Sequence, residues 1–106
     1  MDVEALLIGY TITTDDYKQE VKAETTRSIL AQKQSISRSE FYNGGKAGLQ
    51  PAFVLVTSKL DYSGELEVEL DGVRYGIYRT YEVDEDYIEL YCERKGGYER
   101  PASGTE

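Results

Sequence analysis

The sequence predicts a mainly β fold: a small antiparallel β-barrel or sandwich of about six or seven strands, with one long loop that carries a short helix. Three observations predict it. Apolar and polar residues alternate in several runs, as they do in half-buried strands. An Asp-Gly pair joins two of these runs, as a tight hairpin turn would. Tyr occurs ten times and Trp not at all, and rings that carry a hydroxyl suit a thin fold with wet edges.

The length of the chain fits one domain. The 106 residues are too few for two hydrophobic cores of ordinary size. We place the barrel domain at residues 1–95, with the long loop at 37–51. Residues 96–106 are rich in Gly, Pro and Ser, so we expect a disordered tail there.

The first half of the chain reads as strands. Residues 4–13 alternate in polarity and end at the turn signal Asp15-Asp16. Residues 19–24 and 26–36 then return as two strands or as one bent strand. The second of these segments also has the Ala, Gln and Lys content of a helix, and we favour the strand. Residues 52–60 are apolar on both faces through Val56, which predicts a central strand.

The strictest alternation in the chain lies at residues 65–70. Its apolar residues share one face: Leu66, Val68 and Leu70. Asp71-Gly72 follows and suits a two-residue type I′ turn, because both central positions of that turn need positive φ. The chain therefore returns antiparallel, and we expect a bend or bulge near Gly76.

A third strand completes a meander. Residues 83–86 are polar enough to turn, after which one face of the next strand is apolar: Ile88, Leu90 and Cys92. The tyrosines of residues 72–95 then line both faces of the meander and are structural. A base-stacking role would need a basic groove around them, and the region is acidic.

The segment between the second and the central strand carries the only helical start signal. Ser37 and Glu40 have the spacing of a capping box, in which each side chain bonds a free amide of the first helical turn. Gly44-Gly45 is expected to end the helix, because glycine favours left-handed geometry and resists helix propagation. A flexible stretch closed by Pro51 would follow. Long connections of this kind are usually functional or disordered, so either a partner contact or a mobile loop is expected.

Charge is distributed unevenly along the chain. The net charge is −8 and the isoelectric point about 4.6, which argues against a conventional nucleic-acid binder. Residues 27–59 hold five basic residues and a single acid, whereas residues 61–93 hold eleven acids and two basic residues. These segments are either solvated faces or the two halves of a head-to-tail contact between copies.

The residues offer little catalytic chemistry. His is absent, which removes the commonest general base and metal ligand. Cys92 lies at an inward strand position without a His to activate it, so we expect an inert thiol. The Asp84-Glu85-Asp86 cluster lacks the spaced ligands of an EF-hand loop. We therefore expect no enzyme, no catalytic residue, no metal site and no cofactor.

The sequence also bears on location. One cysteine cannot form an internal disulfide, and no apolar run approaches the ~18 residues of a membrane helix. The Met1 end has no signal-peptide pattern. We expect production in a reducing cytoplasm and no membrane partner.

Two stretches resemble a known family. "SISRSEFYNGGKAGLQPAFVLV" at 35–56 and "DYSGELEVELDGVRYGIYRTYEVDEDYIELYCERK" at 61–95 are similar to the phage head-tail joining family, the head-closure or stopper proteins and head-tail adaptors of tailed bacteriophages and prophages. The likeness runs from about residue 5 to residue 94. It rests on the order and spacing of residues 37–42, 48–51 and 75–81, and none of these is a catalytic motif.

The resemblance implies a structural protein of the virion neck, made in the cytoplasm of the bacterial host. Family members form a ring, implied here to be dodecameric, that docks beneath the portal and its adaptor ring and closes the channel after DNA packaging. The other side of the ring meets the tail-completion protein. Isolated copies can still be monomers, because high net charge keeps them apart. DNA would be met only as the genome passing through the channel.

The resemblance also implies site residues. The long loop would contact a neighbour or the ring above through Ser37, Arg38, Glu40, Phe41, Tyr42, Lys46 and Leu49. The uneven charge alone motivates a further hypothesis, that the meander turns its acids towards a neighbouring subunit or the channel: Glu65, Glu67, Glu69, Asp84, Glu85 and Asp86. Negative charge there would keep passing DNA from adhering.

Two alternatives stay open. The chain could be another ring component of the neck or tail, such as a tail terminator or an adaptor, which would share a small β-rich fold. It could also be a free-standing acidic barrel that binds a protein or a small ligand. The latter predicts a stable monomer without affinity for a capsid vertex.

Overall fold

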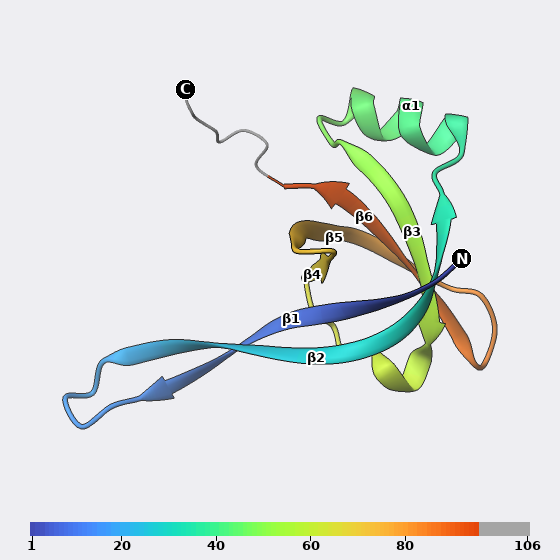
Figure 1. The fold of residues 1–106 in the computed structure, drawn as a ribbon. Coiled ribbons are helices and arrows are strands. Elements are labelled where there is room, and N and C mark those ends of the chain that lie inside the picture. The colour runs from blue at the N-terminus through green and yellow to red at the C-terminus, as the bar shows by residue number, and fades with distance from the viewer. Residues whose placement is uncertain (96–106) are drawn as a thin grey trace.

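The computed structural model of the protein describes residues 1–95 as a closed barrel with one helix and a projecting hairpin (Figure 1). Around the barrel the strands follow the order β1-β2-β3-β6-β5-β4, and all neighbours are antiparallel. The elements in chain order are β1 (Asp2–Thr14), β2 (Glu20–Ser35), α1 (Arg38–Lys46), β3 (Pro51–Ser58), the 3₁₀ turn η1 (Lys59–Asp61), β4 (Glu67–Leu70), β5 (Val73–Glu82) and β6 (Tyr87–Arg94).

This architecture confirms the predicted fold class, with six strands and one short helix. Residues 20–35 form one continuous strand, so the helical alternative for residues 26–36 is wrong. The predicted tail at 96–106 lies outside the described residues.

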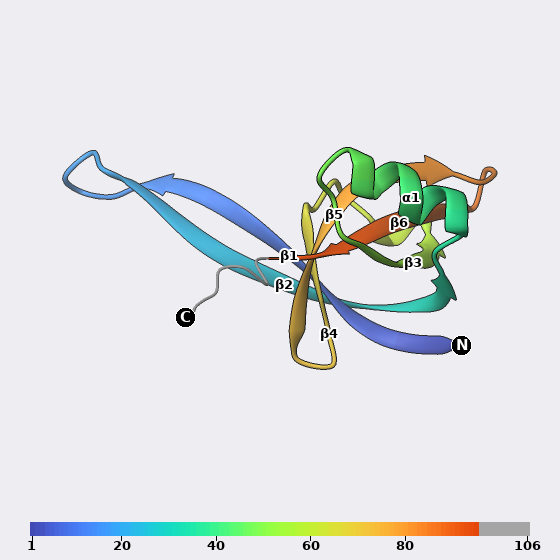
Figure 2. The same ribbon diagram turned by 90° about the horizontal axis from the view of Figure 1, so that it is seen from above.

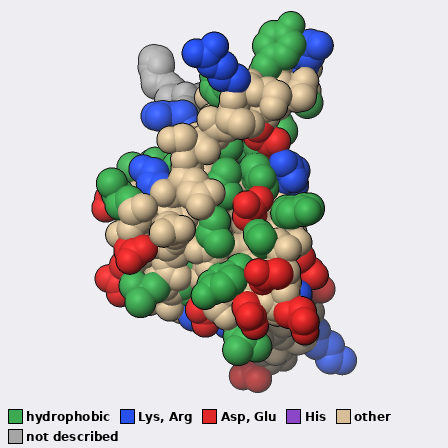
Figure 3. Space-filling view, turned by 90° about the vertical axis from the view of Figure 1, so that its right-hand side faces the viewer, with side chains coloured by type: hydrophobic (Ala, Val, Ile, Leu, Met, Phe, Trp, Pro, Cys, Tyr) green, Lys and Arg blue, Asp and Glu red, His purple; other side chains and the backbone are tan. Residues whose placement is uncertain are grey.

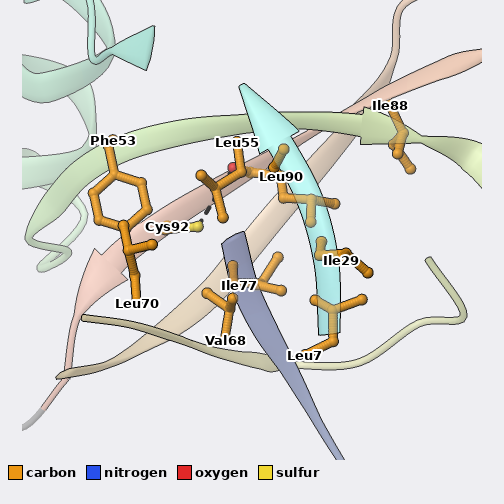
Figure 4. Close-up of a cluster of buried hydrophobic side chains, with 12 residues drawn as sticks. Leu7, Ile29, Phe53, Leu55, Val68, Leu70, Ile77, Ile88, Leu90 and Cys92 are labelled. Carbon is orange, nitrogen blue, oxygen red and sulfur yellow. Dashed lines mark hydrogen bonds between the residues drawn. The ribbon is translucent and has the colours of Figure 1, made fainter. Parts of the chain in front are cut away.

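The alternating apolar residues meet inside the barrel (Figure 4). The largest contributions to this core come from side chains on all six strands, among them Leu7, Ile29, Leu55, Val68, Ile77 and Leu90. Cys92 is also buried there, and its thiol donates to the carbonyl oxygen of Leu90 at 3.5 Å. Burial raises the pKa of the Cys92 thiol to about 12, because the charged thiolate is disfavoured away from water.

One residue of the predicted β4 face departs from the pattern. Val68 and Leu70 are buried as predicted, but Leu66 is 72% exposed. The physical reason is that the strand begins only at Glu67. Leu66 lies before it and contributes a carbonyl oxygen, which accepts from the Ile77 amide at 2.9 Å.

The structure confirms both turns of the predicted three-stranded meander. Asp71 and Gly72 both have positive φ, at 54° and 80°, and they connect β4 to β5. The irregularity of β5 falls between Ile77 and Arg79, so the extra residue is Tyr78 and not Gly76. In the next turn the Asp84 carboxylate accepts from two backbone amides, which closes the β5–β6 connection.

The helix is longer than predicted, because Gly44 and Gly45 lie inside it. A Cβ at Gly44 would stand 2.5 Å from Cγ of Pro51, so this glycine serves close packing of α1 on the start of β3. The helix ends at Lys46, with Ala47 as its C-cap, and the next residue, Gly48, has φ of +85°. The amides of Gly48 and Leu49 donate to the carbonyls of Gly45 and Gly44, the pattern of a Schellman cap.

The β1–β2 hairpin extends well beyond the barrel (Figures 1 and 2). β1 pairs with β4 only from Leu6 to Ile8, and β2 pairs with β3 only from Gln32 to Ser35. Beyond those residues each strand has only the other as its partner. We call residues 10–24 the arm; every residue from 10 to 28 is exposed.

Candidate functional site

A groove lies between the end of β2, the start of α1 and the start of β3. It has a volume of about 1060 Å³, and its lining includes Lys33, Arg38, Phe41 and Tyr42. We call it the cationic groove. Apart from Met1, its residues belong to segments next to one another in the sequence, because the chain leaves β2, makes the helix and re-enters the barrel through β3.

The helix presents several of the predicted partner residues to solvent. Phe41 and Tyr42 are 60% and 65% exposed, and Arg38 is exposed beside them. Lys46 stands 4.8 Å above the Tyr42 ring. Leu49 is half-buried, and its amide takes part in the helix cap. The structure therefore brings Arg38, Phe41 and Tyr42 together at one groove.

Two of the predicted partner residues hold the helix, and one of them, Ser37, also lines the groove. The Ser37 hydroxyl accepts from the Glu40 amide at 3.1 Å, as the capping box predicts. The Glu40 carboxylate turns the other way, towards β5: it accepts from the Tyr78 hydroxyl at 2.5 Å and from two Arg79 nitrogens at 2.7 and 3.2 Å. The reciprocal half of the capping box is therefore replaced by a tie between α1 and the barrel.

This tie extends to β6. The Arg79 guanidinium lies 3.7 Å from the centre of the Tyr91 ring, and the rings of Tyr78 and Tyr91 meet edge to face at 6.2 Å. The hydrogen bond from Arg79, followed by that from Tyr78, holds the pKa of Glu40 below its usual value. Burial raises the pKa of Tyr78, and the bond to Glu40 adds to the rise. The tie therefore fixes where α1 and its exposed rings stand.

The cations of the groove differ from most others in the described chain. Within residues 1–95, five basic side chains pair with carboxylates: Arg27, Lys59, Arg74, Arg79 and Lys95. No ion pair within that range involves Lys33 or Arg38 of the groove, or Lys46 near the end of α1. Lys33 lies 5.0 Å from the centre of the Phe53 ring. Their positive charge is thus available to a partner.

The predicted acidic face divides into two groups that lie apart. The first group lies along β4 and just before it, where each acid meets a cation of the same chain. Glu65 pairs with Arg27 at 2.7 Å. Glu67 pairs with Lys95 at 2.6 Å, and this bond comes first among the causes that hold the pKa of Glu67 below its usual value. Glu69 lies 3.8 Å from Arg74.

The same contacts anchor the base of the arm. Arg74 also donates to Glu24 at 2.8 Å, and the Tyr10 hydroxyl donates to Glu67 at 3.2 Å. Lys22 stands 4.2 Å above the Tyr10 ring. The β4 acids therefore tie the arm to the barrel, which sequence reasoning missed.

The second acidic group is the β5–β6 turn. The first group lies beside the first half of β5, where Glu67 is the register partner of Gly76. The turn at residues 84–86 lies beyond the other end of that strand, which ends at Glu82. The turn sits beside η1, since the Lys59 amide donates to the Asp86 carbonyl at 2.9 Å. One face of the molecule thus has Lys and Arg side chains over α1 and most of its Asp and Glu side chains towards the other end (Figure 3).

The arm is the feature that sequence reasoning missed most completely. Both its strands and its turn were predicted, but the alternation in Tyr10 and Ile12 resembled that of a buried strand. The one available signal is on β2, where residues 18–27 carry a charge or a hydroxyl at most positions.

Among residues 1–95 no group of three or more His, Cys, Asp or Glu side chains is arranged to hold a metal ion. No helix in the same range is long and apolar enough to cross a membrane. Neither the models of known protein families nor the curated proteins give a match to this chain. The arrangement of the site is therefore the basis for a functional proposal, together with the resemblance stated above.

Proposed function

We propose that this protein is a subunit of the ring in the neck of a tailed bacteriophage, where it joins head to tail and closes the portal channel after DNA packaging. Its partners in this proposal are further copies of itself, the portal or adaptor ring and the tail-completion protein. DNA is met only as the passing genome.

One observation carries the proposal beyond the resemblance. The arm projects from one side of the barrel, while the cationic groove lies beside α1 on another (Figures 1 and 2). A subunit of a ring must contact two neighbours through two different surfaces. A small barrel with one projecting element and one receiving groove satisfies that requirement.

The acids of the meander take different roles in this proposal. The β4 glutamates meet cations of their own chain, so the turn at residues 84–86 is the better candidate for the channel or a subunit contact. Glu85 and Asp86 make no ion pair within residues 1–95, and both are exposed. Uncompensated negative charge in a channel would repel the phosphates of DNA.

The test is electron microscopy of the lysate from a parent phage or induced prophage that lacks this gene. The proposal expects separate tails beside unjoined heads that have lost their DNA, and rescue when the gene is supplied from a plasmid. Intact, infectious particles would overturn it. Heads that keep their DNA beside tails of abnormal length would point to a tail terminator instead.

A further inference from the structure

We propose that the arm of one copy docks into the cationic groove of the next copy. This rests on the proposed function in one respect, namely that the occupant of the groove is a second copy of the same chain. It goes further by assigning the two surfaces that join neighbouring subunits and the charges that set their register.

The arm needs a partner on structural grounds. A two-stranded ribbon with solvent on both sides is marginally stable in water, yet β1 and β2 remain paired from Tyr10–Glu24 to Thr14–Glu20. Its apolar side chains contribute little to the barrel: Val21 is 43% and Tyr17 83% exposed. Contact with a second surface would bury them and stabilise the ribbon.

One face of the arm is suited to lie against protein. The inward face of β1 runs through Ala5 and Leu7 in the core, and strand alternation continues it outwards along the arm. In the register of the hairpin this face carries no charge; it consists of Thr11 opposite Ala23 and Thr13 opposite Val21. Small and β-branched residues without charge form a surface that packs well and is cheaply desolvated.

The groove has the complementary properties. Phe41 and Tyr42 offer exposed apolar area to the uncharged face, and Arg38 and Lys33 offer charge that no carboxylate within residues 1–95 compensates. At the end of the arm, Asp16 likewise makes no ion pair in that range and is exposed. Opposite charges on two mating surfaces fix register and suppress wrong partners.

The placement of the two surfaces defines the kind of assembly. Because the arm and the groove are different patches on different sides of the barrel, the contact is heterologous. Heterologous contacts give a closed ring when the rotation between copies closes. The acidic turn at 84–86 is the rival occupant of the groove, and the experiment separates the two.

The first measurement is cross-linking between two single-cysteine variants, one for each surface. Tyr17→Cys marks the arm and Ser39→Cys marks the groove. The native Cys92 can stay, because its thiol is buried. A short bis-maleimide is expected to give heterodimers from the mixture at high protein concentration. Glu85→Cys replaces Tyr17→Cys as the matched control, and cross-linking from Glu85→Cys alone, or from neither arm nor turn, overturns the inference.

The second measurement exchanges the charges. Lys33→Glu with Arg38→Glu on the groove partner, or Asp16→Lys on the arm partner, is expected to lower the cross-link yield by about fivefold or more. Reversing both partners together restores the yield, because the pair is again complementary. Circular dichroism checks that each variant is folded. Equal yields in all four combinations would contradict docking by these charges.

The two proposals can fail separately. Unjoined heads and tails in the deletion lysate with no arm-to-groove cross-link would leave the neck function standing and remove the docking inference. Intact particles in that lysate with a clear cross-link would do the reverse, and the protein would be a self-associating barrel of another kind.

Discussion

The barrel and the arm are made from the same two strands, but they are stabilised differently. In β1 the side chains of Ala5, Leu7 and Ile8 are almost fully buried, in the part of the strand where β4 pairs with residues 6–8. From Tyr10 onwards the strand has only β2 beside it, and every side chain is exposed. The difference teaches that strand pairing on both sides, more than the polarity of the strand itself, decides where this protein has a core.

The largest expected effect comes from a matched pair of truncations, one in each region. Leu90→Ala removes a side chain that is 0% exposed and should lower the free energy of unfolding by about 2–5 kcal/mol. Ile12→Ala on the arm should cost at most about 1 kcal/mol, the span of strand propensity. Urea denaturation followed by circular dichroism measures both. Equal losses would mean that the arm is part of the cooperative core.

A second comparison sets two neighbouring glycines of α1 against each other. Gly44→Ala should destabilise the protein by about 1–3 kcal/mol, because the new methyl group would meet the ring of Pro51 and overpack the contact between α1 and β3. Gly45→Ala has open space around its Cβ and should stabilise the helix by about 0.5–1 kcal/mol. Thermal unfolding of the two variants checks the sign. A stable Gly44→Ala would show that the helix can move away from the strand.

These glycines also show which features of the fold could be predicted from the sequence. Local signals were read correctly where the chemistry is local: the Asp71-Gly72 turn, the Ser37 cap and the inward face of Ile88, Leu90 and Cys92 all follow from one short stretch of chain. The end of α1 could not be predicted from a short stretch of sequence in the same way. Gly44 is explained only by Pro51, which packs against it from the following strand.

The candidate site was predictable only in part, for the same reason. Exposed aromatic and basic residues of α1 were expected to form a contact surface, and Arg38, Phe41 and Tyr42 do line one groove. Glu40 was expected there as well, but its partners Tyr78 and Arg79 are 38 and 39 residues away in sequence. Pairings of that kind depend on the closed barrel, which no local pattern encodes.

The smallest expected effect belongs to this Glu40 tie, and it depends on pH. Hydrogen bonds from Arg79 and Tyr78 lower the pKa of Glu40 from its ordinary value of 4.5. The stabilisation is therefore fully present above that value and is lost as the pH falls through the lowered pKa of the folded protein. Glu40→Gln should cost about 1 kcal/mol near pH 7 and progressively less as the solution becomes more acidic.

Urea denaturation at about pH 7 and about pH 3 measures this convergence, and Glu85→Gln is the matched control. Glu85 is exposed and makes no ion pair within residues 1–95, so its variant should differ from the parent by less than about 0.5 kcal/mol at either pH. A cost of Glu40→Gln that stays the same at both pH values would show that the charge of Glu40 does not hold α1. In that case the position of Phe41 and Tyr42 at the groove would depend on helix packing alone, and the Gly44→Ala variant would be the one to disturb docking.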